Sequence, residues 1–284
     1  MLRRYHVEVA SLGIYILHGL ILAGYAVATV IYFRHFWTKQ PRSGFYASLC
    51  LVLALACHSA FLIARAVESS HAPFVGLHES MSFFAWLIAV VYLFLERRFH
   101  DRSLGVFVLP LILAAQTAST AFMSPVDPLP PLLQSPWFNF HVTASFLAYA
   151  AFSFTFITGL LYVMQMYYIH HRRVGLVFSR LPALGMLDEM NLKATLIGWV
   201  FLSAGIATGI WWATAAWDSI MPWLLDPKVL CVMLTWVIYT SQLITRYTAG
   251  WQGERAAIIS MAGFASVLLA YLGAGLWTNL HIFD

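Results

Sequence analysis

The sequence predicts an all-α fold, a polytopic transmembrane bundle of about eight helices, and its composition carries this prediction. Of the 284 residues, 61% are hydrophobic and only 10% are charged, and the mean hydropathy is +0.76. A soluble domain carries about 25% charged and about 45–50% apolar residues. Spans of about 20 apolar residues, each with its backbone bonded internally, explain both departures. The short loops that remain exclude a sizeable water-soluble catalytic domain.

Four apolar runs in the first half predict the first four helices. Residues 9–33 form a run that is long enough to span, and no small-residue cleavage site follows it, so we expect a retained helix rather than a signal peptide. The runs 45–67, 79–95 and 104–122 come next, each separated from its neighbours by a segment that contains charged residues. These segments predict cytoplasmic and outer loops in alternation.

A proline-rich segment, Ser124 to Pro136, separates the two halves of the chain. Proline favours an extended backbone and cannot continue a helix, so we expect a rigid connector there. Four further apolar runs follow it, at residues 141–168, 193–216, 229–246 and 255–279. We expect all eight spans to form a single integral membrane domain over residues 1–284.

Basic residues predict the orientation, because Lys and Arg are retained in cytoplasmic loops. Twelve of the sixteen follow the first, third, fifth and seventh spans: Arg34, Lys39, Arg42, Arg97, Arg98, Arg102, Arg172, Arg173, Arg180, Lys193, Arg246 and Arg255. We therefore expect a multi-pass inner (plasma) membrane protein with both termini outside. The same loops explain the net charge of +4, so the bilayer is the expected partner and nucleic acid is not.

Two histidines are predicted to lie inside the bilayer. His18 and His58 fall near the middle of the first two spans, where a polar side chain is costly unless it is paired. A hydrogen bond between helices would satisfy each of them. Ligation of a cofactor is the other interpretation, and the sequence leaves both open.

Two other histidines, His141 and His281, lie where an outer loop meets a helix end, with a tryptophan-rich segment between them. An axial histidine pair and an aromatic surface are what a flat, iron-containing macrocycle needs. Imidazole supplies the iron ligand, and indole faces supply apolar contact. Alternatively, both histidines are interfacial and the tryptophans belong to the aromatic belt of the bilayer surface: Trp211, Trp212, Trp217, Trp223 and Trp277.

An ordered set of short segments runs through the second half of the chain. It comprises His141-Val-Thr-Ala-Ser-Phe, Gly159-Leu-Leu-Tyr-Val, Gly205-Ile-Ala-Thr-Gly-Ile-Trp-Trp-Ala, Asp226-Pro-Lys, Thr235-Trp-Val-Ile-Tyr, Gly250-Trp-Gln-Gly-Glu-Arg and Gly263-Phe. Upstream, His58, Arg65, His78-Glu79-Ser and Leu104-Gly105 extend it. As a set these segments resemble the CcsA/CcmC type of cytochrome c assembly protein, a haem-handling family that includes HemX-like proteins.

The resemblance implies a haem b site on the outer, periplasmic face. In that family one outer histidine opens a span, a second follows the last span, and the two hold haem against a tryptophan-rich loop. The matching positions for the iron ligands are His141 and His281. The implied apolar surface is Trp212, Trp217 and Trp223. Asp226 would either cap the next helix or hydrogen-bond a ligand histidine.

The chain also departs from the family pattern. The full haem loop reads W-G-x-Y-W-x-W-D-P-K-E, whereas this chain reads Trp217-Asp-Ser-Ile-Met-Pro-Trp-Leu-Leu-Asp-Pro-Lys-Val, without two of the aromatics and the acid. The complete enzymes carry an intramembrane histidine where this chain has Ile244. The transmembrane haem site is therefore expected to be absent or rebuilt, with His18 and His58 as the intramembrane candidates.

These observations predict a membrane protein that binds or presents haem during cytochrome c maturation. No large outer domain is expected, so attachment of haem to apocytochrome c would need a partner subunit, and the chain is not expected to be an enzyme by itself. One alternative is a HemX-like, non-catalytic membrane regulator or anchor of tetrapyrrole biosynthesis. A second alternative is a transporter of haem or another small solute.

Overall fold

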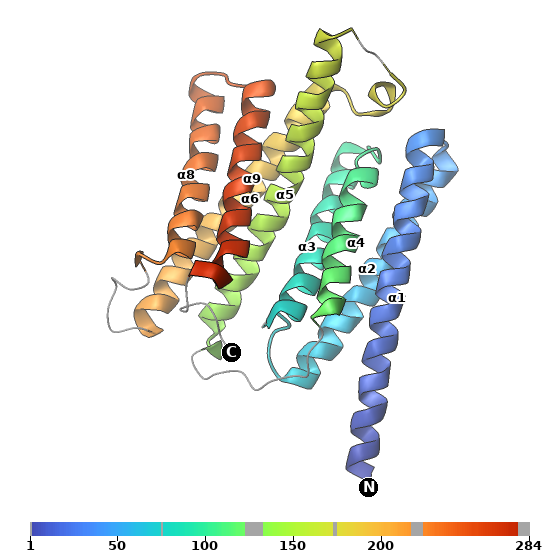
Figure 1. Ribbon diagram of the computed structural model, residues 1–284, viewed down its shortest axis with the longest axis vertical. Coiled ribbons are helices and arrows are strands. Elements are labelled where there is room, and N and C mark those ends of the chain that lie inside the picture. Colours follow the sequence, from blue (N-terminus) through green and yellow to red (C-terminus); the bar gives the residue numbers. More distant parts are fainter. Residues whose placement is uncertain (1, 75, 123–132, 173–174, 217–223, 278–284) are drawn as a thin grey trace. The chain divides into compact units, whose positions relative to one another are not determined.

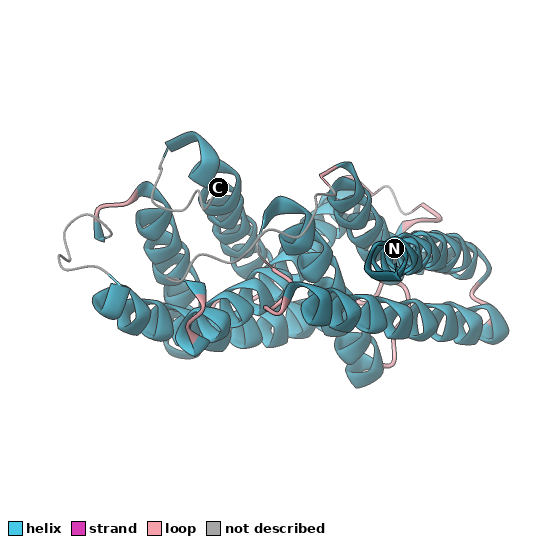
Figure 2. Cartoon of the chain, turned by 90° about the horizontal axis from the view of Figure 1, so that it is seen from below, coloured by secondary structure: helices cyan, strands magenta, loops and turns pink. Residues whose placement is uncertain are grey.

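The computed structural model describes residues 2–74, 76–122, 133–172, 175–216 and 224–277. Within these ranges every regular element is a helix, as predicted (Figures 1 and 2). The elements are α1 (Leu2–Thr38), α2 (Pro41–Ser69), α3 (Gly76–Phe99), α4 (Gly105–Ala121), α5 (Pro136–His170), η2 (Phe178–Arg180), α6 (Leu184–Ala216), α8 (Pro227–Thr248) and α9 (Glu254–Trp277).

Most of the long helices are able to cross a membrane. In the described part of the chain, seven contain an apolar stretch of sufficient length, and only α4, with 17 residues, is shorter. A helix of that length rises about 26 Å, slightly less than the hydrocarbon core of about 30 Å. The protein is therefore a multi-pass membrane protein, and the prediction of a polytopic bundle of about eight helices is confirmed.

Several helices begin before the apolar runs that predicted them, because capping residues rather than hydropathy set their ends. Helix α5 starts at Pro136, where the Ser135 side chain accepts a hydrogen bond from the Trp137 backbone N–H. Helix α8 starts at Pro227 after the Asp226 cap. Both caps combine an acceptor side chain with proline at the first helical position, where its missing N–H costs nothing.

The chain divides into two compact units, Met1–Leu129 (unit 1) and Pro130–Asp284 (unit 2). In unit 1, α1 packs against α2 and α4, and α3 packs against α4 and α2. In unit 2, α5 packs against α6 and α9, while α8 packs against α9 and α6. This division does not test the expectation of a single membrane domain over residues 1–284, which stays a prediction.

Helix α5 is the centre of unit 2 and the most buried of the candidate spans. Near its middle, Phe152 stacks on Tyr239 of α8, with ring centroids 3.7 Å apart. At one end of the unit, the Asp188 carboxylate of α6 accepts two hydrogen bonds from Arg246 of α8, at 2.9 and 2.7 Å, and a third from the Gly253 backbone N–H. These contacts fix α6, α8 and the start of α9 around α5.

Candidate functional site

A pocket lies among the four long helices of unit 2. Its walls are mostly apolar and aromatic, and it is lined by His141, Val142, Ser145, Phe146, Tyr149, Ile206, Gly209, Ile210, Trp212, Ala213, Lys228, Val229, Val232, Met233 and Tyr271. Two of the residues predicted for the haem site, His141 and Trp212, are thus brought to one cavity. A concave, apolar cavity with a few polar groups is typical of sites for flat organic ligands and cofactors.

The imidazole of His141 is held in one tautomer. Its Nδ1 lies 2.7 Å from the carbonyl oxygen of Gly205 on α6. Because a carbonyl oxygen only accepts, Nδ1 carries the proton, and Nε2 of the neutral ring keeps its lone pair. No described residue is hydrogen-bonded to that Nε2. Ligand histidines are commonly oriented by a backbone carbonyl in this way, so His141 can ligate iron through Nε2.

Two glycines of α6 allow α5 to approach closely enough for this bond. A Cβ atom built on Gly209 would lie 2.6 Å from Nδ1 of His141, and one built on Gly205 would lie 2.8 Å from the Ser145 hydroxyl. Contacts this short do not occur between real side chains, so only glycine leaves room for the ring. The segment Gly205–Gly209 therefore positions His141 as well as packing two helices.

Trp212 supplies an aromatic wall beside His141. Its ring lies 6.5 Å from the imidazole, nearly parallel at 19°, and 5.1 Å from the ring of Phe138. Trp212 is 7% exposed, whereas the adjacent Trp211 is 62% exposed and packs on Trp137. The haem-site interpretation thus fits Trp212, and the surface-belt interpretation fits Trp211.

Asp226 is the N-cap of α8. Its Oδ1 accepts a hydrogen bond of 2.8 Å from the Lys228 backbone N–H, and the side chain is buried. This is the capping alternative left open by the sequence; a hydrogen bond to a ligand histidine stays a prediction. The other predicted members of the site, His281, Trp217 and Trp223, lie outside the described residues.

His18 is buried in unit 1 and bonded at both ring nitrogens. Its Nε2 lies 2.7 Å from the Thr120 hydroxyl, which itself donates to the Gln116 carbonyl. Nε2 therefore donates, and the lone pair on Nδ1 accepts from the Gln116 amide nitrogen, 3.3 Å away. In this arrangement His18 has no nitrogen left for a metal.

His58 is fully buried and bonded in the same way. Its Nδ1 accepts from the Tyr25 hydroxyl and its Nε2 donates to the Ser82 hydroxyl, both at 2.9 Å. Ser82 in turn donates to Gln116 Oε1 at 3.3 Å, which joins His58 and His18 through one chain of hydrogen bonds. The helix-to-helix interpretation of these two histidines is therefore realised, and cofactor ligation would require one of these bonds to open.

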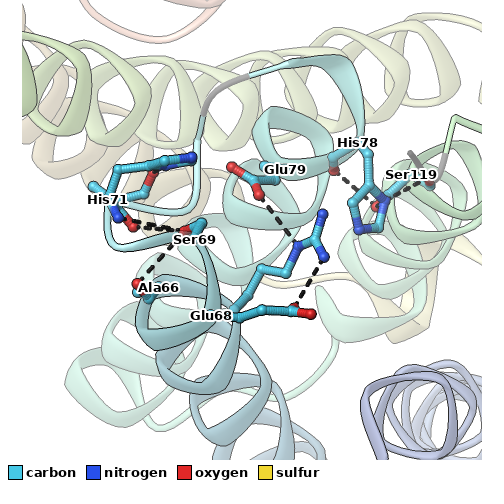
Figure 3. A network of polar contacts seen from close by, with 9 residues as sticks. Ala66, Glu68, Ser69, His71, His78, Glu79 and Ser119 are labelled. Carbon is cyan, nitrogen blue, oxygen red and sulfur yellow. Dashed lines mark hydrogen bonds and ion pairs between the residues drawn. The ribbon is translucent and has the colours of Figure 1, made fainter. Parts of the chain in front are cut away.

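His78 was not among the predicted site residues, although its position at the start of a span beside Glu79 was a signal. Its ring centroid lies 5.7 Å from that of His18. Its Nδ1 donates to the Ser119 carbonyl at 2.8 Å, so Nε2 keeps its lone pair, as in His141. Figure 3 shows His78 beside Ser119.

An ion-pair cluster lies close to His78 in sequence, with Arg65 and Glu79 buried and Glu68 exposed. The Arg65 guanidinium contacts the carboxylates of Glu79 and Glu68, each at 3.2 Å, and Figure 3 draws both pairs. Two carboxylates already neutralise this arginine, so it is part of the α2–α3 packing rather than an available anion site.

Ile244, which replaces the family's intramembrane histidine, is 56% exposed on α8.

The fold and the pocket together define a class, a polytopic helical membrane protein with a histidine and a tryptophan in an apolar cavity. Residues 74–281 match the cytochrome c assembly protein family. The chain belongs to this family, as the ordered motifs predicted. The match covers α3, α4 and the helices of unit 2, whereas α1 and α2 lie outside it.

The curated relatives have consistent names. The cytochrome c biogenesis protein CcsA of Chlamydomonas reinhardtii is 34% identical over 222 residues, which cover 76% of this chain. The chain spans 61% of the length of that protein. CcsA of Chlorella vulgaris is 31% identical over 78% of this chain and 80% of its own length. CcsA of Gloeobacter violaceus is 26% identical over 94% of both.

Proposed function

We propose that this protein binds haem b in the pocket of unit 2 and presents it for attachment to apocytochrome c. Its family membership supports a role in cytochrome c biogenesis, the process for which the relatives are named. The observation that carries the haem proposal is His141, which lines an aromatic pocket with Nδ1 bonded to the Gly205 carbonyl and Nε2 available. A neutral histidine so oriented is suited to haem iron.

Each predicted site residue has a proposed role. His141 of the pocket would hold the iron together with His281, Trp212 would contact the ring faces together with Trp217 and Trp223, and Asp226 fixes the start of α8. Haem, when bound, supplies the vinyl groups that react with cysteine thiols. The chain's own contribution is binding, orientation and exclusion of water from an apolar cavity.

We also propose where and with what the protein acts. The basic loops support a position in the inner (plasma) membrane with the pocket toward the outer face. The apocytochrome thiols would be presented by a partner subunit, so the chain works as one part of a haem-attachment system. His18 and His58 remain proposed ligands of a second, intramembrane haem, on the condition that Gln116 or Tyr25 releases a ring nitrogen.

The second candidate is a HemX-like regulator or anchor of tetrapyrrole biosynthesis. One observation favours it: the position of the family's intramembrane histidine holds Ile244, on an exposed face of α8. A regulator would act through the cytoplasmic loops and would not need bound iron. Co-purification of a cytoplasmic enzyme of that pathway, lost when residues 170–191 are replaced, would favour this candidate.

The deciding experiment is the visible spectrum and pyridine haemochrome of the purified full chain. We expect a Soret band that weakens in His141→Ala and in His281→Ala. His170→Ala is the matched control, because His170 lies exposed at the opposite end of α5. No haem after haem-supplemented expression would exclude the haem proposal and favour the regulator. Haem loss in His141→Ala with unchanged cytochrome c levels would exclude the maturation role alone.

A further inference from the structure

The pocket of unit 2 contains one charged side chain among its lining residues, that of Lys228. Lys228 follows Pro227 in the first turn of α8 and is half-buried. Its backbone N–H is bonded to the Asp226 cap, but its ammonium makes no hydrogen bond or ion pair with any described residue. The Asp226 carboxylate, two residues earlier, attracts this ammonium but makes no direct ion pair with it. A cation thus lies at the wall of a largely apolar cavity without a bonded counter-ion among the described side chains.

An ammonium in such surroundings is costly unless an anion accompanies it. The positive end of the α8 dipole lies at the same place and adds to the attraction for negative charge. The remaining walls are mostly apolar and aromatic, with Phe146, Val232 and Met233 among them. The cavity therefore complements a molecule with a broad apolar body and a carboxylate at one edge.

We propose that Lys228 binds a carboxylate of the ligand, so that the pocket selects porphyrins with free carboxylates whether or not they contain iron. The inference rests on the proposed function, because it places a porphyrin in this pocket. It is separate from iron ligation, because the propionates and the iron are different parts of the molecule. His141 and Lys228 line one cavity, so a single haem can meet both.

The test uses iron-free protoporphyrin IX and its dimethyl ester, titrated into the detergent-purified full chain and followed by porphyrin fluorescence anisotropy. In Lys228→Gln we expect protoporphyrin binding to weaken about tenfold or more, the size of one charge-assisted hydrogen bond. Lys228→Arg should retain most of the affinity. The ester should bind the wild type weakly and be unaffected by Lys228→Gln, since it has no carboxylate to lose.

Lys193→Gln is the matched control, because Lys193 is exposed on α6, about 20 Å along the helix from the pocket residue Ile206. Equal affinity of the wild type for acid and ester would overturn the inference, as would unchanged binding in Lys228→Gln or no binding at all. If Lys228→Gln does not fold, the acid-to-ester ratio in the wild type still decides.

The two proposals fail in different ways. Lys228-dependent binding of iron-free porphyrin, together with haemin that shows no His141-dependent Soret band, would remove iron ligation and leave the carboxylate site. A His141-dependent haemin spectrum with equal binding of acid and ester would do the reverse.

Discussion

At the scale of residues, the two nitrogens of a buried imidazole decide what a histidine can do. His58 and His18 use both nitrogens in a chain of hydrogen bonds that runs in one direction from Tyr25 to Thr120. His141 uses only Nδ1, toward a backbone carbonyl. Burial alone would rank the fully buried His58 above His141 as a ligand, whereas hydrogen bonding ranks His141 above both His58 and His18.

A methyl group at Gly209 should displace His141. In Gly209→Ala the new Cβ would lie 2.6 Å from Nδ1, so we expect strongly reduced haem content and a loss of about 1–3 kcal/mol in the free energy of unfolding. Soret absorbance and chemical unfolding in detergent measure the two effects. Gly185→Ala on the same helix is the control, since nothing lies within 4 Å of its Cβ. Equal haem content in both variants would contradict this account of Gly209.

Substitutions at Asp226 separate its two possible roles. Asp226→Ala removes the cap of α8 and should cost about 1 kcal/mol of stability, whereas Asp226→Asn keeps a capping side chain. If capping is the whole role, we expect haem titrations of Asp226→Asn to match those of the wild type. If haem binding is weaker in Asp226→Asn as well as in Asp226→Ala, the negative charge of Asp226 acts on a ligand histidine.

At the scale of elements, hydropathy predicted which helices exist, but side-chain chemistry sets where they begin. The spans predicted from residues 141 and 229 start at Pro136 and Pro227, because Ser135 and Asp226 cap them. Helix rotation was not predictable from the sequence, since packing sets it. The meeting of His18, His58 and His78 around Phe61 therefore appeared only in the structure. His141 and Trp212 were predictable, because family motifs mark them.

The hydrogen-bonded cluster should stabilise unit 1 independently of haem in unit 2. His58→Ala leaves a cavity and takes partners from Tyr25 and Ser82, so we expect a loss of about 3 kcal/mol in stability. The haem bound in the pocket of unit 2 should be retained. His71→Ala, at a half-buried turn position, is the control. A fall in the haem-to-protein ratio for His58→Ala alone would indicate a second haem in unit 1.

At the scale of the whole molecule, charge distribution predicts how the chain lies in the bilayer. We expect a reporter that is active only outside the cytoplasm to work when fused after residue 284 and to fail when fused after Gly250, which follows α8. The basic residues Arg246 and Arg255 flank that second position. Activity of the Gly250 fusion and silence of the C-terminal one would reverse the orientation and place the pocket on the other face.

The family match starts at residue 74, between α2 and α3, yet the hydrogen bonds of His18 and His58 cross that border to Ser82, Gln116 and Thr120. Directional hydrogen bonds thus join α1 and α2, which lie outside the family match, to α3 and α4, which lie inside it. A chimera that exchanges α1 and α2 for those of a relative would have to carry matching donors and acceptors on α3 and α4. The border seen in sequence is therefore a poor place to cut or recombine this protein.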